Sequence, residues 1–173
     1  MARQAIRNEG AGAERAFLGL VAKSRLTDSA KRGDAIVSVD GADNYIEIKY
    51  VTSNTVNQVR AIKFIPLVIY SPQHNRQWAV LPAHEVVRLV FQKDRGQHTE
   101  IALECANMTL SGVPAMFRFD DDGLSDAVHT AIRDARKYSL LAAALPELLQ
   151  NIRVMNESYR KRIEIALQQG DAA

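Results

Sequence analysis

Two charged residues, Glu47 and Lys49, stand two positions apart in the segment NYIEIKYVTS. The segment is otherwise rich in β-branched and aromatic residues, which favour a β-strand. Because side chains alternate between the faces of a strand, Glu47 and Lys49 project from one face and Ile46, Ile48 and Tyr50 from the other. Burying a lone charge is costly. A carboxylate and an ammonium group together on such a strand therefore indicate chemistry rather than packing, the alternative being two polar residues on a half-solvated strand.

A second carboxylate can join this pair if the preceding segment forms a hairpin. The sequence DAIVSVDGADNYIEIKYVTS is typical of a β-hairpin, with Asp-Gly-Ala-Asp as its turn. With an even number of loop residues, Asp34 lies opposite Lys49 and Ile36 opposite Glu47. The two carboxylates are then diagonal neighbours about 7–8 Å apart. With an odd number, Asp34 points to the other face and no site forms.

Two carboxylates at that distance could hold a hard divalent cation. Mg²⁺ prefers oxygen ligands and keeps several water molecules, so two carboxylates and a substrate phosphate suffice. A neighbouring lysine can stabilise negative charge on a phosphate or help to lower the pKa of an attacking water. Phosphodiester hydrolysis requires both functions, so the residues predict Mg²⁺-dependent phosphodiester chemistry.

The arrangement resembles the PD-(D/E)XK nuclease superfamily: Asp34, then twelve residues, then Glu47-Ile48-Lys49, on two strands that follow a helix. The resemblance implies that Asp34 and Glu47 bind Mg²⁺, that the Ile48 carbonyl is a further ligand, and that Lys49 lies beside the attacked phosphate. Gly33 stands where the name of the motif has proline.

Two further residues match positions used in that superfamily. A helix is predicted over 11–25, with Glu14 at the edge of its apolar face, and many members carry a glutamate there that reaches the metal. A second helix, opened by Asn54 or Thr55, would carry Gln58, as in several branches. Glu14 could instead be a solvated or ion-paired residue, and Gln58 could close a capping box with Thr55.

Polar residues that follow the motif are candidates for contacts with DNA phosphates or bases. The alternative is a polar helix start. Residues 1–33 contain seven Lys or Arg and three acidic residues, which suits a polyanionic partner but also a solvated surface. The candidate DNA-binding residues are Tyr50, Ser53, Asn54, Asn57 and Arg60.

The resemblance favours a type II restriction endonuclease that cuts double-stranded DNA as a homodimer. A Holliday-junction resolvase or another structure-selective nuclease, a non-catalytic DNA-binding protein of the same fold, and an unrelated α+β protein stay open. A stripe on the last predicted helix could serve the dimer or pack inside the chain. It comprises Leu148, Ile152, Met155, Tyr159 and Ile163.

The predicted fold class is α/β (α+β), a central mixed sheet flanked by helices as in restriction endonucleases. The 173 residues are 47% hydrophobic and 24% charged, as in an ordinary globular protein. We expect a nuclease core over 1–123 and a helical C-terminal extension over 124–173, with Pro146 opening the last helix. The segment FDDDG could bind a metal but is more simply an acidic turn, and the four histidines show no metal-ligand spacing.

A cytoplasmic protein without a membrane segment is the expectation for localisation. The longest apolar run, FIPLVIY, is too short to cross a bilayer, and the first residues contain no apolar signal segment. The single cysteine, Cys105, cannot form an internal disulfide and is predicted to be a buried small hydrophobe.

Overall fold

The structure is a computed structural model that describes residues 2–29 and 31–170. The chain forms two units, Met1–Ser139 and Leu140–Ala173. The first unit holds both sheets and three α-helices of the described residues, and it extends past residue 123 to include α3 (Asp121–Arg136). The second is helical, and each unit is described by itself.

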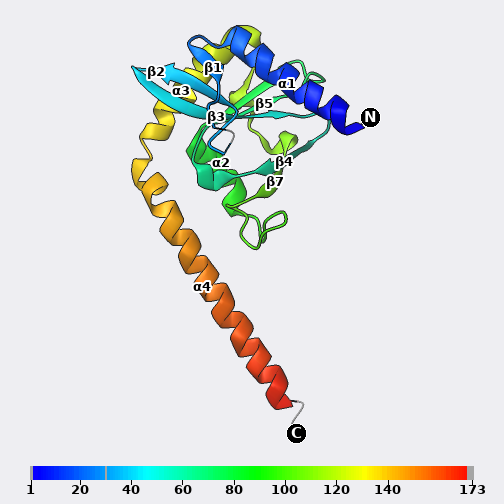
Figure 1. The fold of residues 1–173 in the computed structure, drawn as a ribbon, viewed down its shortest axis with the longest axis vertical. Helices are drawn as coiled ribbons and strands as arrows, with labels where there is room; N and C mark the ends of the chain where they lie inside the picture. The colour runs from blue at the N-terminus through cyan, green and yellow to red at the C-terminus, as the bar shows by residue number, and fades with distance from the viewer. Residues whose placement is uncertain (1, 30, 171–173) are drawn as a thin grey trace. The chain divides into compact units, whose positions relative to one another are not determined.

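Within the described residues, the main sheet has six strands in the order β1-β2-β3-β5-β6-β8, and β4 pairs with β7 in a second sheet (Figure 1). β3 and β5 run parallel, whereas the other neighbours in the main sheet are antiparallel. The predicted fold class, an α/β fold with a central mixed sheet flanked by helices, is confirmed. The strands are β1 (Ser24–Leu26), β2 (Ala35–Val39), β3 (Ala42–Tyr50), β4 (Thr55–Val59), β5 (Leu67–Tyr70), β6 (Trp78–Leu81), β7 (Ala106–Thr109) and β8 (Arg118–Phe119).

The hairpin of β2 and β3 is tighter than predicted. Its turn is the dipeptide Asp40-Gly41, with φ angles of 53° and 79°, as a two-residue type I′ turn requires. The predicted four-residue turn is wrong, because Ala42 already pairs with Val39. The loop is still even, so the side-chain faces are as expected, but the register moves by two residues.

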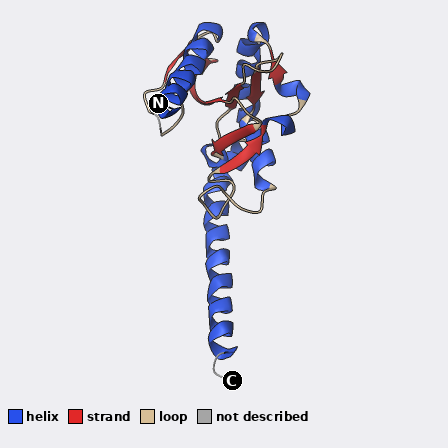
Figure 2. Ribbon diagram, turned by 90° about the vertical axis from the view of Figure 1, so that its right-hand side faces the viewer, coloured by secondary structure: helices blue, strands red, loops and turns tan. Residues whose placement is uncertain are grey.

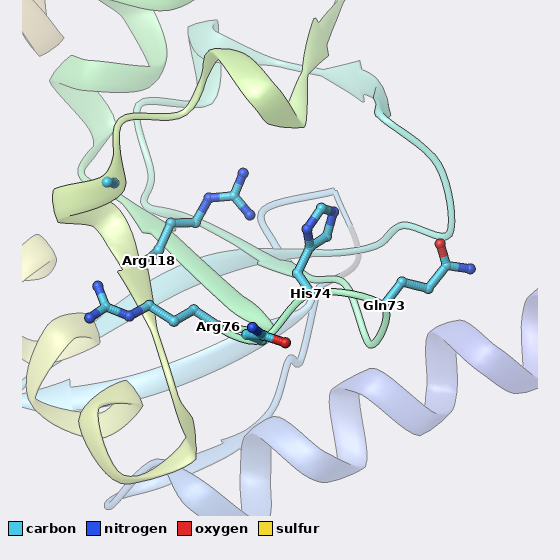
Figure 3. Close-up of a pocket in the computed structure, with 6 residues that line it drawn as sticks. Gln73, His74, Arg76 and Arg118 are labelled. Carbon is cyan, nitrogen blue, oxygen red and sulfur yellow. The ribbon is translucent and has the colours of Figure 1, made fainter.

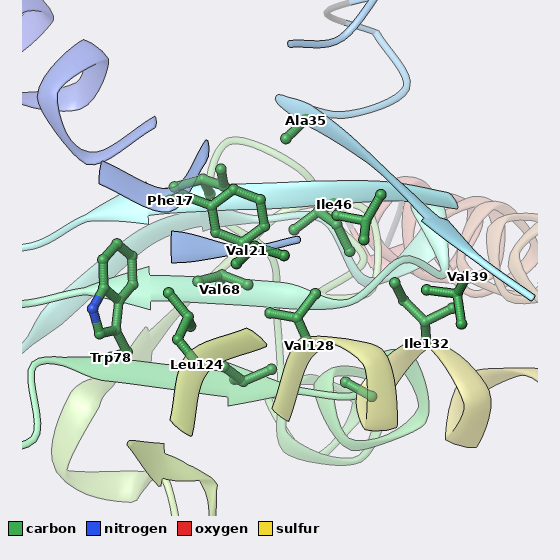
Figure 4. Packing of buried hydrophobic residues seen from close by; sticks show 14 of the residues in the cluster. Phe17, Val21, Ala35, Val39, Ile46, Val68, Trp78, Leu124, Val128 and Ile132 are labelled. Carbon is green, nitrogen blue, oxygen red and sulfur yellow. The ribbon is translucent and has the colours of Figure 1, made fainter. Parts of the chain in front are cut away.

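The helices α1 (Ala2–Leu20) and α3 cover one face of the main sheet. In Figure 4, Phe17 of α1 and Leu124 of α3 meet strand residues such as Ile46 and Val68. Phe17, Ile46, Val68 and Leu124 are each fully buried. A Phe→Ala change at such a position costs about 3–5 kcal/mol, so this layer contributes strongly to the stability of the sheet.

The helix predicted over 11–25 is too long at its C-terminal end. α1 ends at Leu20, and Ser24–Leu26 form the edge strand β1 instead. Lys23 lies between them with a φ of 56°, in the left-handed region that no α-helix continues through. The apolar stripe beyond Leu20 therefore includes only Val21, which is buried against the same core.

The second predicted helix, carrying Gln58, is absent from the described structure. Its residues form β4, which pairs with β7, and then the short 3₁₀ helix η1 (Ala61–Lys63). Val56 and Val59 are three positions apart, a spacing that also occurs on one face of a helix. A register shift between them, where Gln58 has a φ of 55°, lets both valines be buried in a strand.

The other helices of the first unit are α2 (Ala83–Phe91) and α3. The 3₁₀ turns η2 (Leu110–Gly112) and η3 (Ala115–Phe117) precede β8. Figure 2 distinguishes the helices, in blue, from the strands, in red. The acidic segment expected to be a turn instead opens α3. Asp121, in its first turn, accepts hydrogen bonds from the Trp78 Nε1 and Gln77 Nε2 groups at 2.7 and 2.6 Å. Cys105 is free and buried, as predicted.

The second unit is the helix α4 (Ser139–Gly170), which contains Pro146 in its interior rather than at its start. Proline costs about 3 kcal/mol inside a helix. The preceding LLAAAL segment consists of strong helix formers, which explains why the helix already begins at Ser139. On the predicted stripe, Leu148 and Met155 are exposed and Ile152 is half-buried, while the Tyr159 and Ile163 side chains lie outside the described residues.

No helix among the described residues has both the length and the apolar character needed to cross a bilayer.

Candidate functional site

Glu47 projects from the face of the sheet opposite the one that α1 and α3 cover, because its neighbours Ile46 and Ile48 belong to the core on that covered face. The ladder between β2 and β3 ends where Ala35 pairs with Ile46, and Asp34 lies just before it. The prediction that Asp34 faces Lys49 is wrong, because the turn has two residues rather than four. Asp34 is still near enough to Glu47 for the charge of Glu47 to act on its carboxyl group and raise its pKa.

Backbone contacts fix the position of Asp34 at the start of β2. Its N–H donates to the Ile46 carbonyl at 2.8 Å, and its Oδ2 accepts a 2.8 Å hydrogen bond from the Ile48 N–H. Gly33 allows this close approach, because a Cβ atom there would lie 2.8 Å from the Ile46 carbonyl oxygen. Glycine before the aspartate is thus a steric requirement of this hairpin.

Glu47 is the most enclosed charged group of the site. Its side chain is 9% exposed, and its two oxygens each contact a lysine: Oε1 lies 2.8 Å from Lys49 Nζ and Oε2 lies 2.6 Å from Lys63 Nζ. Burial alone would raise the pKa of Glu47, but the two ammonium groups outweigh it and hold that pKa below its ordinary value. Glu47 is therefore ionised at neutral pH.

Lys63 was not predicted from the sequence. It lies in η1, after β4, and reaches Glu47 from a segment that was expected to be a helix. The one sequence signal for it is indirect. A buried carboxylate requires compensating charge, and a single lysine that is also expected to contact a phosphate leaves Glu47 without a partner of its own.

The other two carboxyl groups, those of Asp34 and Glu14, have raised pKa values. Burial raises the pKa of Asp34; the Ile48 N–H opposes this, and the charge of Glu47 adds to it. Burial also raises the pKa of Glu14 on α1, and the charge of Asp34 raises it further. Glu14 thus lies within electrostatic reach of Asp34, on the helix where it was predicted.

The described side chains do not form a complete metal cage. Among them, no group of three or more His, Cys, Asp or Glu residues is arranged to hold a metal ion. The available protein oxygens are those of Asp34 and Glu47, with the Ile48 carbonyl beside them in sequence. A Mg²⁺ ion commonly uses one or two carboxylates and completes its shell with water and substrate phosphate.

Gln58 does not join this charged group. It lies on β4, exposed, and its backbone N–H donates to Gln97 Oε1 and Asn107 Oδ1 at 3.1 and 3.2 Å. No helix begins at Thr55, so the capping-box alternative is also wrong. Within the described hydrogen bonds, none joins Gln58 to Asp34 or Glu47.

The candidate DNA-contacting residues have different surroundings. Asn54 is structural, since its Nδ2 donates to Ser111 Oγ at 3.0 Å and its Oδ1 accepts from the Ser111 N–H at 2.8 Å. Tyr50 is half-buried at the end of β3, with its ring 6.0 Å from that of Tyr70. Ser53, Asn57 and Arg60 are exposed, as is Asn54.

Comparisons with protein-family models, with curated proteins and with solved structures each gave no match. The chemistry of the carboxylate–lysine group (Asp34, Glu47, Lys49 and Lys63) is therefore the basis for assigning a function.

Proposed function

We propose that the protein is a Mg²⁺-dependent nuclease that hydrolyses phosphodiester bonds in double-stranded DNA. One observation carries the proposal: the Asp34 carboxylate, which accepts from the Ile48 N–H, lies within electrostatic reach of Glu47, and the Lys49 ammonium lies 2.8 Å from Glu47. The residues and their spacing resemble the PD-(D/E)XK superfamily, which supplies the choice of DNA as substrate.

The carboxylate–lysine group suits a divalent cation. Its acidic side chains offer the hard oxygen donors that Mg²⁺ prefers. Glu47 already attracts two ammonium groups, and the pKa values of Asp34 and Glu14 are raised in part by neighbouring negative charge. A cation would bind in competition with these lysines and with the proton of Asp34. Asp34 and Glu47 would hold the ion, with the Ile48 carbonyl as a further ligand.

When bound, Mg²⁺ supplies Lewis-acid chemistry, polarising a phosphoryl oxygen and making water a better nucleophile. Lys49 is placed to donate from its ammonium group to a non-bridging oxygen of the scissile phosphate, where negative charge increases during attack. Lys63 keeps a hydrogen bond to Glu47 and so holds that carboxylate ionised. The buried sheet beneath fixes these groups relative to one another.

Within this class we favour a cytoplasmic type II restriction endonuclease acting as a homodimer. The exposed Leu148 and Met155 on α4 support a dimer, because apolar side chains at helical spacing are available for a partner. A structure-selective nuclease such as a junction resolvase is the second candidate. The observation that favours it is Glu14, which lies within electrostatic reach of Asp34 on the first helix.

The test is cleavage of mixed-sequence duplex DNA by wild type, Lys49→Ala and Asp34→Asn, each with Mg²⁺ and with a chelator. Asparagine keeps an oxygen that can accept the Ile48 hydrogen bond, so Asp34→Asn removes charge with little change of shape. We expect no cleavage without metal, none with Asp34→Asn, and a rate about 10²–10³ lower with Lys49→Ala.

A matched control is Lys93→Ala, which removes an exposed lysine from the loop after α2. Cleavage by Lys49→Ala and Asp34→Asn at the rate of this control would contradict the proposal. Ca²⁺ should support DNA binding without cleavage, because its larger and looser shell positions water poorly. Preference for a four-way junction over linear duplex would identify the second candidate.

A further inference from the structure

A pocket of about 450 Å³ lies outside the carboxylate–lysine group, beside the turn that joins β5 to β6 (Figure 3). Its described lining contains two arginines, a histidine and two amides, and it includes no carboxylate. Such a set donates many hydrogen bonds and carries positive charge, so the chemistry points to an anionic ligand. The lining residues are Gln73, His74, Asn75, Arg76, Ala115 and Arg118.

Hydrogen bonds to backbone carbonyls shape both walls of this pocket. On the turn, the Ser71 N–H donates to the Gln77 carbonyl at 2.7 Å, and the His74 N–H donates to the Ser71 carbonyl at 3.2 Å. On the other wall, Arg118 NH2 donates to the Leu110 carbonyl at 2.5 Å. That bond uses one of the five N–H donors of the guanidinium, which leaves others for a ligand.

The pocket and the proposed cleavage site share one face of the sheet. Lys49 pairs with Ile69, Ile69 with Ala79, and Ala79 with Arg118, so the four residues form one row across β3, β5, β6 and β8. Directly paired residues project to the same side. Three strand intervals separate Lys49 from Arg118, a distance of about 14 Å at about 4.8 Å per interval.

Hydrogen bonds also connect the loop after β3 to the arginine wall of the pocket. The Leu110 N–H donates to the Asn54 carbonyl at 2.7 Å, while the Leu110 carbonyl accepts from Arg118. Asn54 and Ser111, which bond to each other, are both exposed beside this link. A polar surface therefore lies between the end of β3 and the pocket, and a phosphate chain could follow it.

We propose that this pocket binds a backbone phosphate of the nucleic acid, at a second phosphate site separate from the cleaved bond. The choice of nucleic acid as the polyanion depends on the proposed function. Arg76 and Arg118 match phosphate oxygens through their planar N–H pairs, and His74 and the amides add donors. A separation of about 14 Å allows one DNA backbone to contact both sites, with the two phosphates a few nucleotides apart.

The test measures binding of a labelled mixed-sequence DNA duplex by fluorescence anisotropy over a range of salt concentrations, with Ca²⁺ in place of Mg²⁺. The variant is Arg76→Gln, an exposed turn residue, and the control is Arg95→Gln, an equal charge change at an exposed loop residue outside the pocket. Arg118 is unsuitable, because it also holds the Leu110 carbonyl. Thermal unfolding of each protein checks that the fold is intact.

We expect Arg76→Gln to raise Kd about threefold to tenfold and to lower the slope of log K against log salt by about one, since one phosphate contact is lost. Adding His74→Gln should weaken binding further. Equal affinity and slope for Arg76→Gln and Arg95→Gln would overturn the proposal. The proposal would also be overturned if wild type binds inorganic phosphate while Arg76→Gln keeps the duplex affinity of wild type. That result would assign the pocket to a small phosphorylated ligand.

Cleavage separates this inference from the proposed function. If wild type binds duplex DNA but does not cut it, the nuclease proposal fails, and the Arg76 comparison still decides the pocket. If wild type cuts and Arg76→Gln binds as tightly as wild type does, the pocket proposal alone fails. If wild type does not bind nucleic acid at all, both fail.

Discussion

Replacing Lys63 by methionine tests how the carboxylate–lysine group holds its charges. The Lys63 side chain is 15% exposed and its Nζ lies 2.6 Å from Glu47 Oε2. Methionine is similar in length and flexible, so it can keep the apolar packing of the lysine stem while removing the ammonium group. The variant therefore measures the loss of one charged hydrogen bond on a buried carboxylate.

The expected loss of unfolding free energy is about 2 kcal/mol. A hydrogen bond to a charged group contributes about 1.5–3 kcal/mol. Breaking a fully buried pair costs about 3–5 kcal/mol, which is an upper limit here because Lys49 still contacts Glu47. For a chain of this length, about 2 kcal/mol corresponds to a fall in Tm of about 4–8 °C.

The pH dependence of this loss has a definite sign. The pKa of folded Glu47 lies below its ordinary value of 4.5, although burial alone would raise it, because Lys49 and Lys63 outweigh burial. The carboxylate therefore stabilises the fold above pH 4.5, and this contribution is lost as pH falls through the folded pKa. Lys63→Met should consequently differ most from wild type near neutral pH and progressively less below pH 4.5.

Urea unfolding at pH 7 and at pH 4 measures both effects, with Lys93→Met as the control for loss of an exposed lysine. The double variant Glu47→Gln/Lys63→Met should be more stable than the sum of the single changes implies, since the two residues interact directly. A Lys63→Met protein within about 0.5 kcal/mol of the Lys93→Met control at pH 7 would refute the reasoning, because that is the range of ordinary surface changes.

Two further outcomes are expected from other parts of the hairpin. Gly33→Ala should lower the unfolding free energy by about 1–3 kcal/mol in urea titrations, because the added Cβ would lie 2.8 Å from the Ile46 carbonyl oxygen. The control is Gly12→Ala on α1, where nothing lies within 4 Å of an added Cβ, and it should not destabilise the protein. Arg25→Gln should raise the pKa of Asp43 from about 2 toward 3.8, as measured by NMR titration of the carboxyl carbon. An unchanged pKa would show that Arg25 does not cause the low pKa of Asp43. In wild type, the stability due to this pair is lost as pH falls from 3.8 through about 2.

The strand faces of the hairpin were predicted correctly, whereas its register was predicted wrongly. Only the parity of the loop decides which side chains share a face, and loops of two and four residues have the same parity. The two loops differ in register by two positions, and this difference moves the partner of Ala35 from Ile48 to Ile46. Asp40-Gly41 is a strong signal for the two-residue turn, so the correct register was available from the sequence.

The crossover between β3 and β5 could not be predicted, because its periodicity is ambiguous. Val56 and Val59 have helical spacing, but a bulge at Gln58 gives a strand the same pair of buried positions. Pairing with β7 decides between the two, and that contact comes from a segment about 50 residues later in the sequence. Because Lys63 follows this segment, its contact with Glu47 depends on the same tertiary choice.

The contact of Lys63 with Glu47 changes how the charges of the carboxylate–lysine group are balanced. A motif of two carboxylates and one lysine suggests a site in which Lys49 is available for substrate and both carboxylates for metal. Two ammonium groups contact Glu47, so a cation that approaches Glu47 must compete with Lys49 and Lys63. A cation that approaches Asp34 must compete with a proton, because the pKa of Asp34 is raised. Lys63 can remain on Glu47 while Lys49 turns toward a phosphate, so the second lysine lets the first leave without exposing an unpaired buried charge. Under the proposed function, the pair of lysines would divide two tasks, charge compensation and phosphate contact, that a single lysine would have to perform alone.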